Sequence, residues 1–260
     1  MKSIKSNLFG EVAAPQNLSD LLQVISEHAA IRRNVYLWRG QANIDWPIHS
    51  SAYRRLAKTK EEIKESHICG YEEYLLDQAT HQGYRFENGK ELSDFELLAK
   101  LQHHGAATRL IDCSRNLLVA LWFCCSTELE KTGLIFGLHT NHILGSERSN
   151  ELRKYREICK ELEKSSHPQS WQPPIVTKRI ASQSAHFLYS KVSDSPMGSL
   201  AIHSDKKVYI AIAIEPSIKQ KLLNHLEGTF DISYLSLFPD IDGFGHAHSF
   251  RYEQFQNERW

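Results

Sequence analysis

The spacing of apolar residues predicts helices of different character along the chain. Residues 19–31 place apolar side chains on one helical face, and the first residue of this stretch is expected to cap the helix. Ser93 and Glu96 have the spacing of a capping box, which predicts a second helix after them. Residues 117–125 are apolar nearly all round, so a helix capped by Ser114 should lie in the core.

Strands are predicted where apolar residues alternate or follow a turn signal. The alternating residues 207–214 form the clearest strand, and residues 134–139 and 233–238 predict two more. A helix should occupy residues 216–228, because a proline stands in its first turn and a glycine at its end. Residues 165–174 carry three prolines and are expected to form a loop. This irregular mixture favours an α+β fold over a doubly wound parallel sheet.

Composition limits the classes of protein that fit. The chain has 260 residues, 41% of them hydrophobic, and no linker is apparent, so we expect a single domain over residues 1–260. The 31 basic and 31 acidic residues cancel, so no global positive field indicates nucleic-acid binding. The five cysteines show no CxxC spacing, and no stretch has the length of a membrane span or the form of a signal peptide. We therefore expect reduced cysteines in a cytoplasmic protein without membrane contact.

An arginine, a glycine and an amide end the apolar run at residues 36–41. The guanidinium of Arg39 offers several donors in a planar fork, and Gly40 allows close approach to the backbone. Together with Gln41 these groups suit a phosphate or a carboxylate, although an arginine at a strand end is often a surface ion pair.

A second polar block, residues 102–112, lies between two apolar helical stretches. Arg109 and Asp112 are close enough in sequence to form a buried ion pair that holds the loop. Thr108 belongs to the same concentrated polar group, and His104 could serve as a general base because imidazole titrates near neutral pH.

With these two blocks and the later stretch 237–243, the chain resembles the FRG family, which is named for an aromatic residue followed by Arg-Gly, here Trp38-Arg39-Gly40. The resemblance extends from about Tyr36 to Gly243. That family is similar in its expected layout to ADP-ribosyltransferases, which have a split β-sheet core with surrounding helices. The resemblance implies that NAD is the co-substrate.

The same resemblance suggests roles for individual residues. Arg39 would contact the pyrophosphate or ribose, Gly40 the carboxamide of nicotinamide, and Gln41 its ring. Thr108, Arg109 and Gln183 would be further NAD-binding residues. Next to Gln183, Ser184 stands at a position where the family commonly has glycine. Elsewhere in the chain, Cys113 stands at a position where the family usually has an aromatic residue.

A carboxylate is needed to stabilise the positive charge that develops on ribose when the nicotinamide bond breaks. Asp240 and Asp242 would face the same side of an extended segment, although an Asx turn explains them equally well. The transferase pattern normally has Glu, so Glu253 is kept as a second choice for this role.

The leading hypothesis is therefore an NAD-dependent ADP-ribosyltransferase, a toxin or anti-phage defence effector that is restrained by an antitoxin or inhibitor protein. Its acceptor would be a nucleic acid or a protein, with a slight preference for RNA or DNA because Trp46, Tyr53 and Trp171 could stack on bases. One alternative is a nucleotide-binding or protein-interaction module without turnover. The other is a metal-dependent hydrolase that uses the ligand set Asp240, Asp242, His246 and His248.

Overall fold

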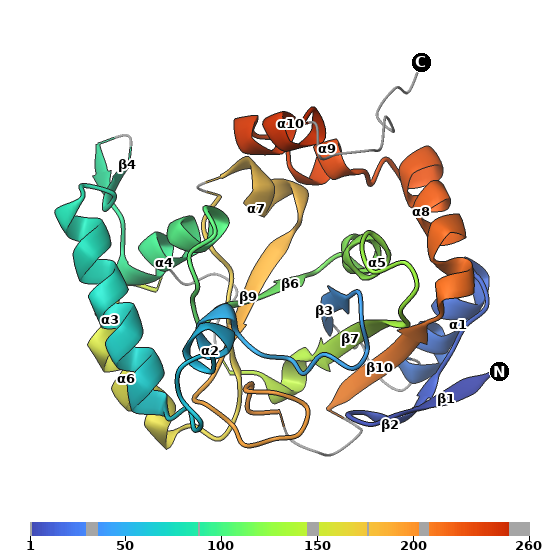
Figure 1. Cartoon of the computed structure of the whole chain (residues 1–260), viewed down its shortest axis with the longest axis horizontal. Helices are drawn as coiled ribbons and strands as arrows, with labels where there is room; N and C mark the ends of the chain where they lie inside the picture. Colours follow the sequence, from blue (N-terminus) through green and yellow to red (C-terminus); the bar gives the residue numbers. More distant parts are fainter. Residues whose placement is uncertain are drawn as a thin grey trace.

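The computed structural model describes residues 2–29, 36–87, 89–144, 151–175, 177–202 and 208–249. Within them, eight strands form one mixed sheet in the order β1-β2-β10-β7-β3-β6-β9-β8, and helices surround this sheet (Figure 1). This arrangement agrees with the expected α+β class. No helix in the described part of the chain combines the length and apolar character needed to cross a bilayer.

The strands of the sheet, in chain order, are β1 (Ser3–Ser6), β2 (Gly10–Ala13), β3 (Tyr36–Gln41), β6 (Ile111–Ser114), β7 (Gly133–His139), β8 (Gln169–Trp171), β9 (Ala185–Tyr189) and β10 (Tyr209–Ile214). A separate small hairpin pairs β4 (Phe86–Glu87) with β5 (Lys90–Glu91). Within the sheet, β10 and β2 are parallel and the other neighbours are antiparallel.

The sheet is almost divided between β3 and β6. These strands share a single residue pair, Trp38 with Ser114, whereas β3 pairs with β7 from Tyr36 to Gln41. One half-sheet therefore runs from β1 to β3, and the other contains β6, β9 and β8. The two halves diverge beyond the shared pair, and this junction determines where a cavity can form.

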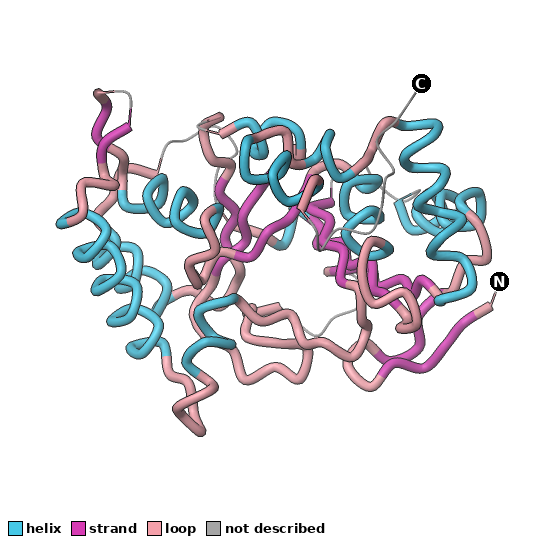
Figure 2. Tube along the Cα trace, turned by 45° about the horizontal axis from the view of Figure 1, so that its top comes forward, coloured by secondary structure: helices cyan, strands magenta, loops and turns pink. Residues whose placement is uncertain are grey.

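The helices are α1 (Leu18–Ala29), α2 (Ser51–Leu56), α3 (Glu65–His81), α4 (Asp94–His103), α5 (Leu117–Cys125), α6 (Tyr155–Lys164), α7 (Lys178–Ser182), α8 (Pro216–Phe230), α9 (Tyr234–Leu237) and α10 (Ile241–Ala247). A 3-10 turn, η1, spans Thr140–His142. Figure 2 shows helices at both ends of the sheet and further helices between these two groups.

Three apolar clusters fix these layers. Residues of α1, α5 and α8 pack on one face of the first half-sheet, where Trp38 and Ile212 belong to the same cluster. The opposite face is covered by Phe9 and by the loop residues Ile44 and Leu200. Helices α3, α4 and α6 enclose a third cluster with β8 and β9.

Helix α5 lies directly on β3 because Gly40 leaves space for it. A Cβ atom at Gly40 would sit 1.8 Å from the carbonyl oxygen of Ala120, far inside van der Waals contact. The buried helix predicted from its apolar residues is confirmed, but its cap is Asn116, which accepts from the Leu118 amide. Ser114, the expected cap, is instead the last residue of β6.

Several other boundaries differ from expectation. Helix α1 begins at Leu18, and the Asn17 side chain accepts from the backbone amide of Asp20. Residues 165–174 contain β8 at the sheet edge and are not only a loop. The predicted strand 233–238 is wrong, because Ser233 caps the short helix α9.

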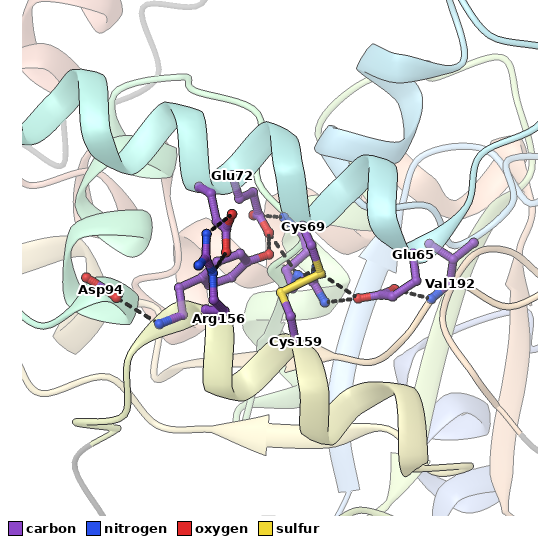
Figure 3. Close-up of a disulfide and its surroundings, with 10 residues drawn as sticks. Glu65, Cys69, Glu72, Asp94, Arg156, Cys159 and Val192 are labelled. Atoms are coloured by element: carbon purple, nitrogen blue, oxygen red, sulfur yellow. Dashed lines mark hydrogen bonds and ion pairs between the residues drawn. A yellow bond between two sulfur atoms is a disulfide. The ribbon is translucent and has the colours of Figure 1, made fainter.

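Cys69 and Cys159 form a disulfide between α3 and α6, with their Cα atoms 6.3 Å apart (Figure 3). The expectation that all cysteines are reduced is therefore wrong. Cys113, Cys124 and Cys125 are free and buried. The bridge joins segments 90 residues apart in sequence, and spacing alone does not reveal such a pairing.

Candidate functional site

A pocket of about 320 Å³ lies at the junction of the two half-sheets. Its volume is within the range of small-molecule sites, about 300–1,000 Å³. Residues of β3, β6, β9, α4, α5 and α7 line it, and Phe238 closes one side. The aromatic lining residues are Trp38, Phe123, Phe187 and Phe238. The charged and amide side chains are Arg39, Gln102, His103, Asp112, Arg179 and Gln183.

Arg39 is held in one orientation at the wall of the pocket. Its Nη1 donates to the backbone oxygen of Asp112 at 2.8 Å, and its Nε donates to Gln41 Oε1 at 3.1 Å. Gln41 is buried and donates to the Trp46 carbonyl at 2.9 Å. The amide of Gln41 therefore orients Arg39. Gln41 itself does not line the pocket, although it was expected to contact the nicotinamide ring.

The carboxylate of Asp112 lies in the pocket beside this guanidinium. Gln102, in the last turn of α4, donates to Asp112 Oδ1 at 2.7 Å. Desolvation by the surrounding protein raises the pKa of Asp112, although the residue keeps an exposed side, while the charge of Arg39 and the hydrogen bond from Gln102 oppose this rise. A pocket carboxylate with a raised pKa is an arrangement typical of functional sites.

Asp240 lies at the edge of the pocket, where other groups already bind its carboxylate. Arg179 forms an ion pair with it, and Nη2 donates to Oδ1 at 2.7 Å. His103 Nε2 lies 3.3 Å from Oδ2, and the Gly243 amide donates to Oδ1 at 2.8 Å. Hydrogen bonding from Arg179 is the main cause that lowers the pKa of Asp240.

Asp240 and Asp242 do not lie on an extended segment, so the expected strand geometry is wrong. Asp240 caps helix α10, and Asp242 is in the first turn of that helix. The Asp242 side chain is 59% exposed and lies 3.5 Å from Nδ1 of the equally exposed His104. The cap agrees with the alternative reading of Asp240 as a turn-forming residue.

His103 occupies the pocket position expected for His104. The His103 side chain is 13% exposed and lines the pocket, whereas the His104 side chain is 59% exposed. Burial, followed by the charge of Arg179, lowers the pKa of His103, and Asp240 opposes that shift.

Thr108 and Arg109 are buried outside the pocket, contrary to the NAD-binding roles expected for them. Arg109 does not pair with Asp112 as expected. Its Nε donates to Glu72 at 2.8 Å, and its Nη1 donates to Glu65 at 2.8 Å. Arg109 therefore anchors the segment before β6 to helix α3, outside the pocket.

Gln183 does line the pocket, and its Nε2 donates to the Leu237 carbonyl at 3.0 Å. The next residue, Ser184, has φ +46°, a conformation that glycine adopts without strain. Cys113, at the usual aromatic position, lines the pocket as a neutral thiol, because burial raises its pKa to about 12.

The expected metal set is not assembled. Among the described residues, the groupings whose ligand atoms approach one another are Glu65 with Cys69 and Cys159, and His103 with Asp240 and Asp242. His246 stacks near Tyr234 and His248 near Phe244. In the second grouping, Arg179 already supplies a positive charge to Asp240. Glu253 lies outside the described residues.

Arg179 and His103 had not been selected from sequence, although each stands within a block that had been noted. Arg179 is four residues before Gln183, and His103 follows Gln102 directly. The signal that would have found His103 is the one-turn spacing that places residues 99, 102 and 103 at one end of α4.

The FRG domain model matches residues 34–133 of the chain, which confirms the resemblance based on the Arg39 and Gln102–Asp112 blocks. The match includes β3, α4 and β6, and it ends before Arg179, Gln183 and Asp240. No curated protein and no solved structure matches the chain.

Proposed function

We propose that the pocket of this FRG-domain chain binds NAD and that the protein transfers ADP-ribose to a macromolecule. One observation carries the proposal: the Arg39 guanidinium, which donates to the backbone of Asp112, and the Asp112 side chain both line an aromatic-lined pocket where the sheet is almost split. A dinucleotide carries both phosphate groups and flat rings, so it matches the cationic and the aromatic parts of this lining. The nearly divided sheet supports an ADP-ribosyltransferase-like core.

In this proposal Arg39 binds phosphate. Because its contacts with Asp112 and Gln41 fix the plane of the guanidinium, little ordering is needed when an anion arrives. The ring of nicotinamide or adenine would pack against aromatic side chains of the pocket such as Phe123 and Phe238. Gly40 supports the site indirectly, since it allows α5 to bring Phe123 to the pocket.

Asp112 is the carboxylate that fits the transition state. Breaking the bond between ribose C1′ and nicotinamide leaves positive character on the sugar, which a nearby carboxylate stabilises. Asp240 is engaged by Arg179 and the Gly243 amide, and Asp242 does not line the pocket. Asp112 therefore replaces both in the proposed mechanism.

His103 is suited to accept the proton of the attacking group. Its pKa is lowered, so its imidazole is neutral and able to act as a base near pH 7, and Asp240 holds its Nε2. When the acceptor oxygen or nitrogen bonds to C1′, its proton would pass to His103, and nicotinamide would leave with the electron pair of the broken bond. His104 is 59% exposed and does not line the pocket, so this role is not assigned to it.

The structure leaves one of the three expected aromatic residues free to stack on a nucleic-acid acceptor. Trp171 is buried, so it cannot stack on a base, and Tyr53 already stacks on His49 with ring centroids 4.2 Å apart. Trp46, which is 46% exposed, still offers a stacking surface. RNA, DNA and protein should therefore be tested side by side, as should an inhibitor protein that restrains the activity.

The test is incubation of the protein with NAD labelled in the ADP-ribose part, together with RNA, DNA or lysate protein. We expect label transfer to one class, at least about 10²-fold less transfer for Asp112→Asn, and loss of NAD binding for Arg39→Ala and Arg39→Lys. Arg55→Ala is the matched control, because Arg55 of α2 packs over the ring of Tyr71 of α3, outside the pocket.

Two results would separate the alternatives. NAD binding that depends on Arg39, without label transfer or nicotinamide release, would indicate a nucleotide-binding module. Unchanged NAD binding and turnover in both Arg39 variants would show that the pocket is not the site.

A further inference from the structure

The Cys69–Cys159 disulfide lies among charged side chains between α3 and α6 (Figure 3). Arg109 is the centre of this cluster. Its side chain is 3% exposed, that of Glu72 is fully buried and that of Glu65 is 14% exposed. Arg109 Nη2 lies 3.2 Å from Cys69 Sγ and 3.9 Å from Cys159 Sγ, so the bridge is in contact with the guanidinium.

The surroundings of Cys69 suit a thiol as well as a disulfide. Cys69 Sγ lies 3.2 Å from Glu65 Oε1, where the hydrogen of a free thiol would be accepted. The sulfur can accept from Arg109 Nη2 in either state. Because both redox states satisfy these polar neighbours, opening the bridge does not leave a buried group without a partner.

We propose that Cys69 and Cys159 form a reversible redox site whose reduction by a dithiol loosens the Asp112 side of the pocket. The dithiol attacks Cys69 Sγ, the S–S bond breaks, and Cys159 leaves as a thiol after protonation. The second thiol of the reductant then attacks the mixed disulfide and releases Cys69. Two electrons and two protons pass to the protein, and the dithiol becomes a cyclic or linear disulfide.

Access favours attack at one sulfur. Cys69 is half-buried on α3, whereas Cys159 is 7% exposed on α6. Cys69 is the more exposed residue of the bridge, so we assign the attack of the reductant to its sulfur.

A continuous set of contacts leads from this bridge to the pocket. The backbone amide of Arg109 donates to Glu72 Oε1 at 2.6 Å, and this fixes the backbone next to Thr108. The Thr108 hydroxyl donates to Gln102 Oε1, and Gln102 Nε2 donates to Asp112 Oδ1 at 2.7 Å.

The bridge holds α3 against α6, and both helices supply side chains to the cluster around Arg109. Glu65 and Glu72 belong to α3, and Tyr155 of α6 donates its hydroxyl hydrogen to Glu72. Opening the bridge removes the covalent restraint between the helices. Glu65 then shares Oε1 between Arg109 and the new thiol, which weakens the hold on Arg109.

The test is hydrogen–deuterium exchange of the whole protein, oxidised and after treatment with dithiothreitol, with alkylation to count accessible thiols. We expect dithiothreitol to expose the thiols of Cys69 and Cys159, and exchange over residues 102–112 to rise at least about threefold. Reoxidation should reverse the change. The Cys69→Ser/Cys159→Ser protein should show fast exchange from the start and no response to dithiothreitol.

Three results would overturn the proposal: no disulfide in air-oxidised protein, no difference in exchange over residues 102–112 on reduction, or a response that persists in the double variant. If the double variant does not fold, reduction and reoxidation of the unmodified chain decide the matter. Because exchange needs no NAD, this experiment can fail while the proposed transferase activity stands, and the reverse also holds.

Discussion

Replacing Arg109 with alanine should lower the stability of the fold more than it alters the pocket chemistry. The substitution leaves Glu72, whose side chain is fully buried, without its guanidinium partner. Breaking a buried ion pair by removing one partner costs about 3–5 kcal/mol. For a chain of this size the melting temperature should fall by roughly 6–20 °C, at about 2–4 °C per kcal/mol.

The assay is urea unfolding followed by circular dichroism under oxidising conditions, with Asp112→Asn as the matched comparison. If Arg109 paired with Asp112, both substitutions would be costly. The structure instead predicts that Asp112→Asn changes the unfolding free energy by less than about 1 kcal/mol, because burial disfavours the charged form of Asp112 and asparagine can still accept from Gln102.

The reasoning about Arg109 would be refuted by a loss below about 1 kcal/mol in Arg109→Ala, or by an equal loss in Asp112→Asn. A double variant, Arg109→Met with Glu72→Leu, adds a stricter check. Replacing both charges by apolar groups of similar volume should recover part of the lost stability, since no unpaired carboxylate remains at Glu72.

Two further predictions concern packing and pH. Gly40→Ala should destabilise the fold by about 3 kcal/mol or more, because its Cβ would overlap the Ala120 carbonyl. The control Gly70→Ala, on a helix with nothing within 4 Å, should instead raise the urea midpoint. Arg179 lowers the pKa of Asp240 from its ordinary value of 3.8. The ionised carboxylate therefore stabilises the fold fully at a pH above 3.8, and this contribution is lost as the pH falls through the lowered pKa. Asp240→Asn should therefore be less stable than the unmodified chain at pH 6, and the difference should disappear in acid unfolding; an unchanged difference would contradict the pairing.

Strong local patterns were enough to predict much of the fold. The capping box at Ser93 and Glu96 and the proline in the first turn of α8 are confirmed. So are the buried helix α5 and the strands β7 and β10. In each case the signal is contained within a few neighbouring residues, so no tertiary contact is needed to read it.

Other features depend on contacts that sequence spacing does not show. The strand predicted at residues 233–238 is wrong because a serine cap and packing against Phe238 favour a short helix there. The disulfide between Cys69 and Cys159 spans 90 residues, and the partners of Arg109 stand 37 and 44 residues away. Such pairings depend on how α3 and α6 pack.

The Arg109–Asp112 pairing was wrong for a simple geometric reason. Arg109 lies at a bend before β6, whereas Asp112 lies within β6. Arg109 therefore reaches the carboxylates of α3, while Asp112 reaches the pocket. The bend between the two residues explains how one short segment supplies both a buried anchor and a pocket carboxylate.

Asp112 and Asp240 show why the choice of a catalytic carboxylate needed the structure. Asp240 is a helix cap with a bound arginine, so its pKa is lowered and its charge is already used in holding α10. Asp112 has a raised pKa, and in the pocket its neighbours are an arginine and an amide. A carboxylate whose charge is incompletely compensated by the protein gains most when a positive charge develops beside it. The two residues are the same in sequence, and their surroundings assign one to stability and the other to the proposed chemistry.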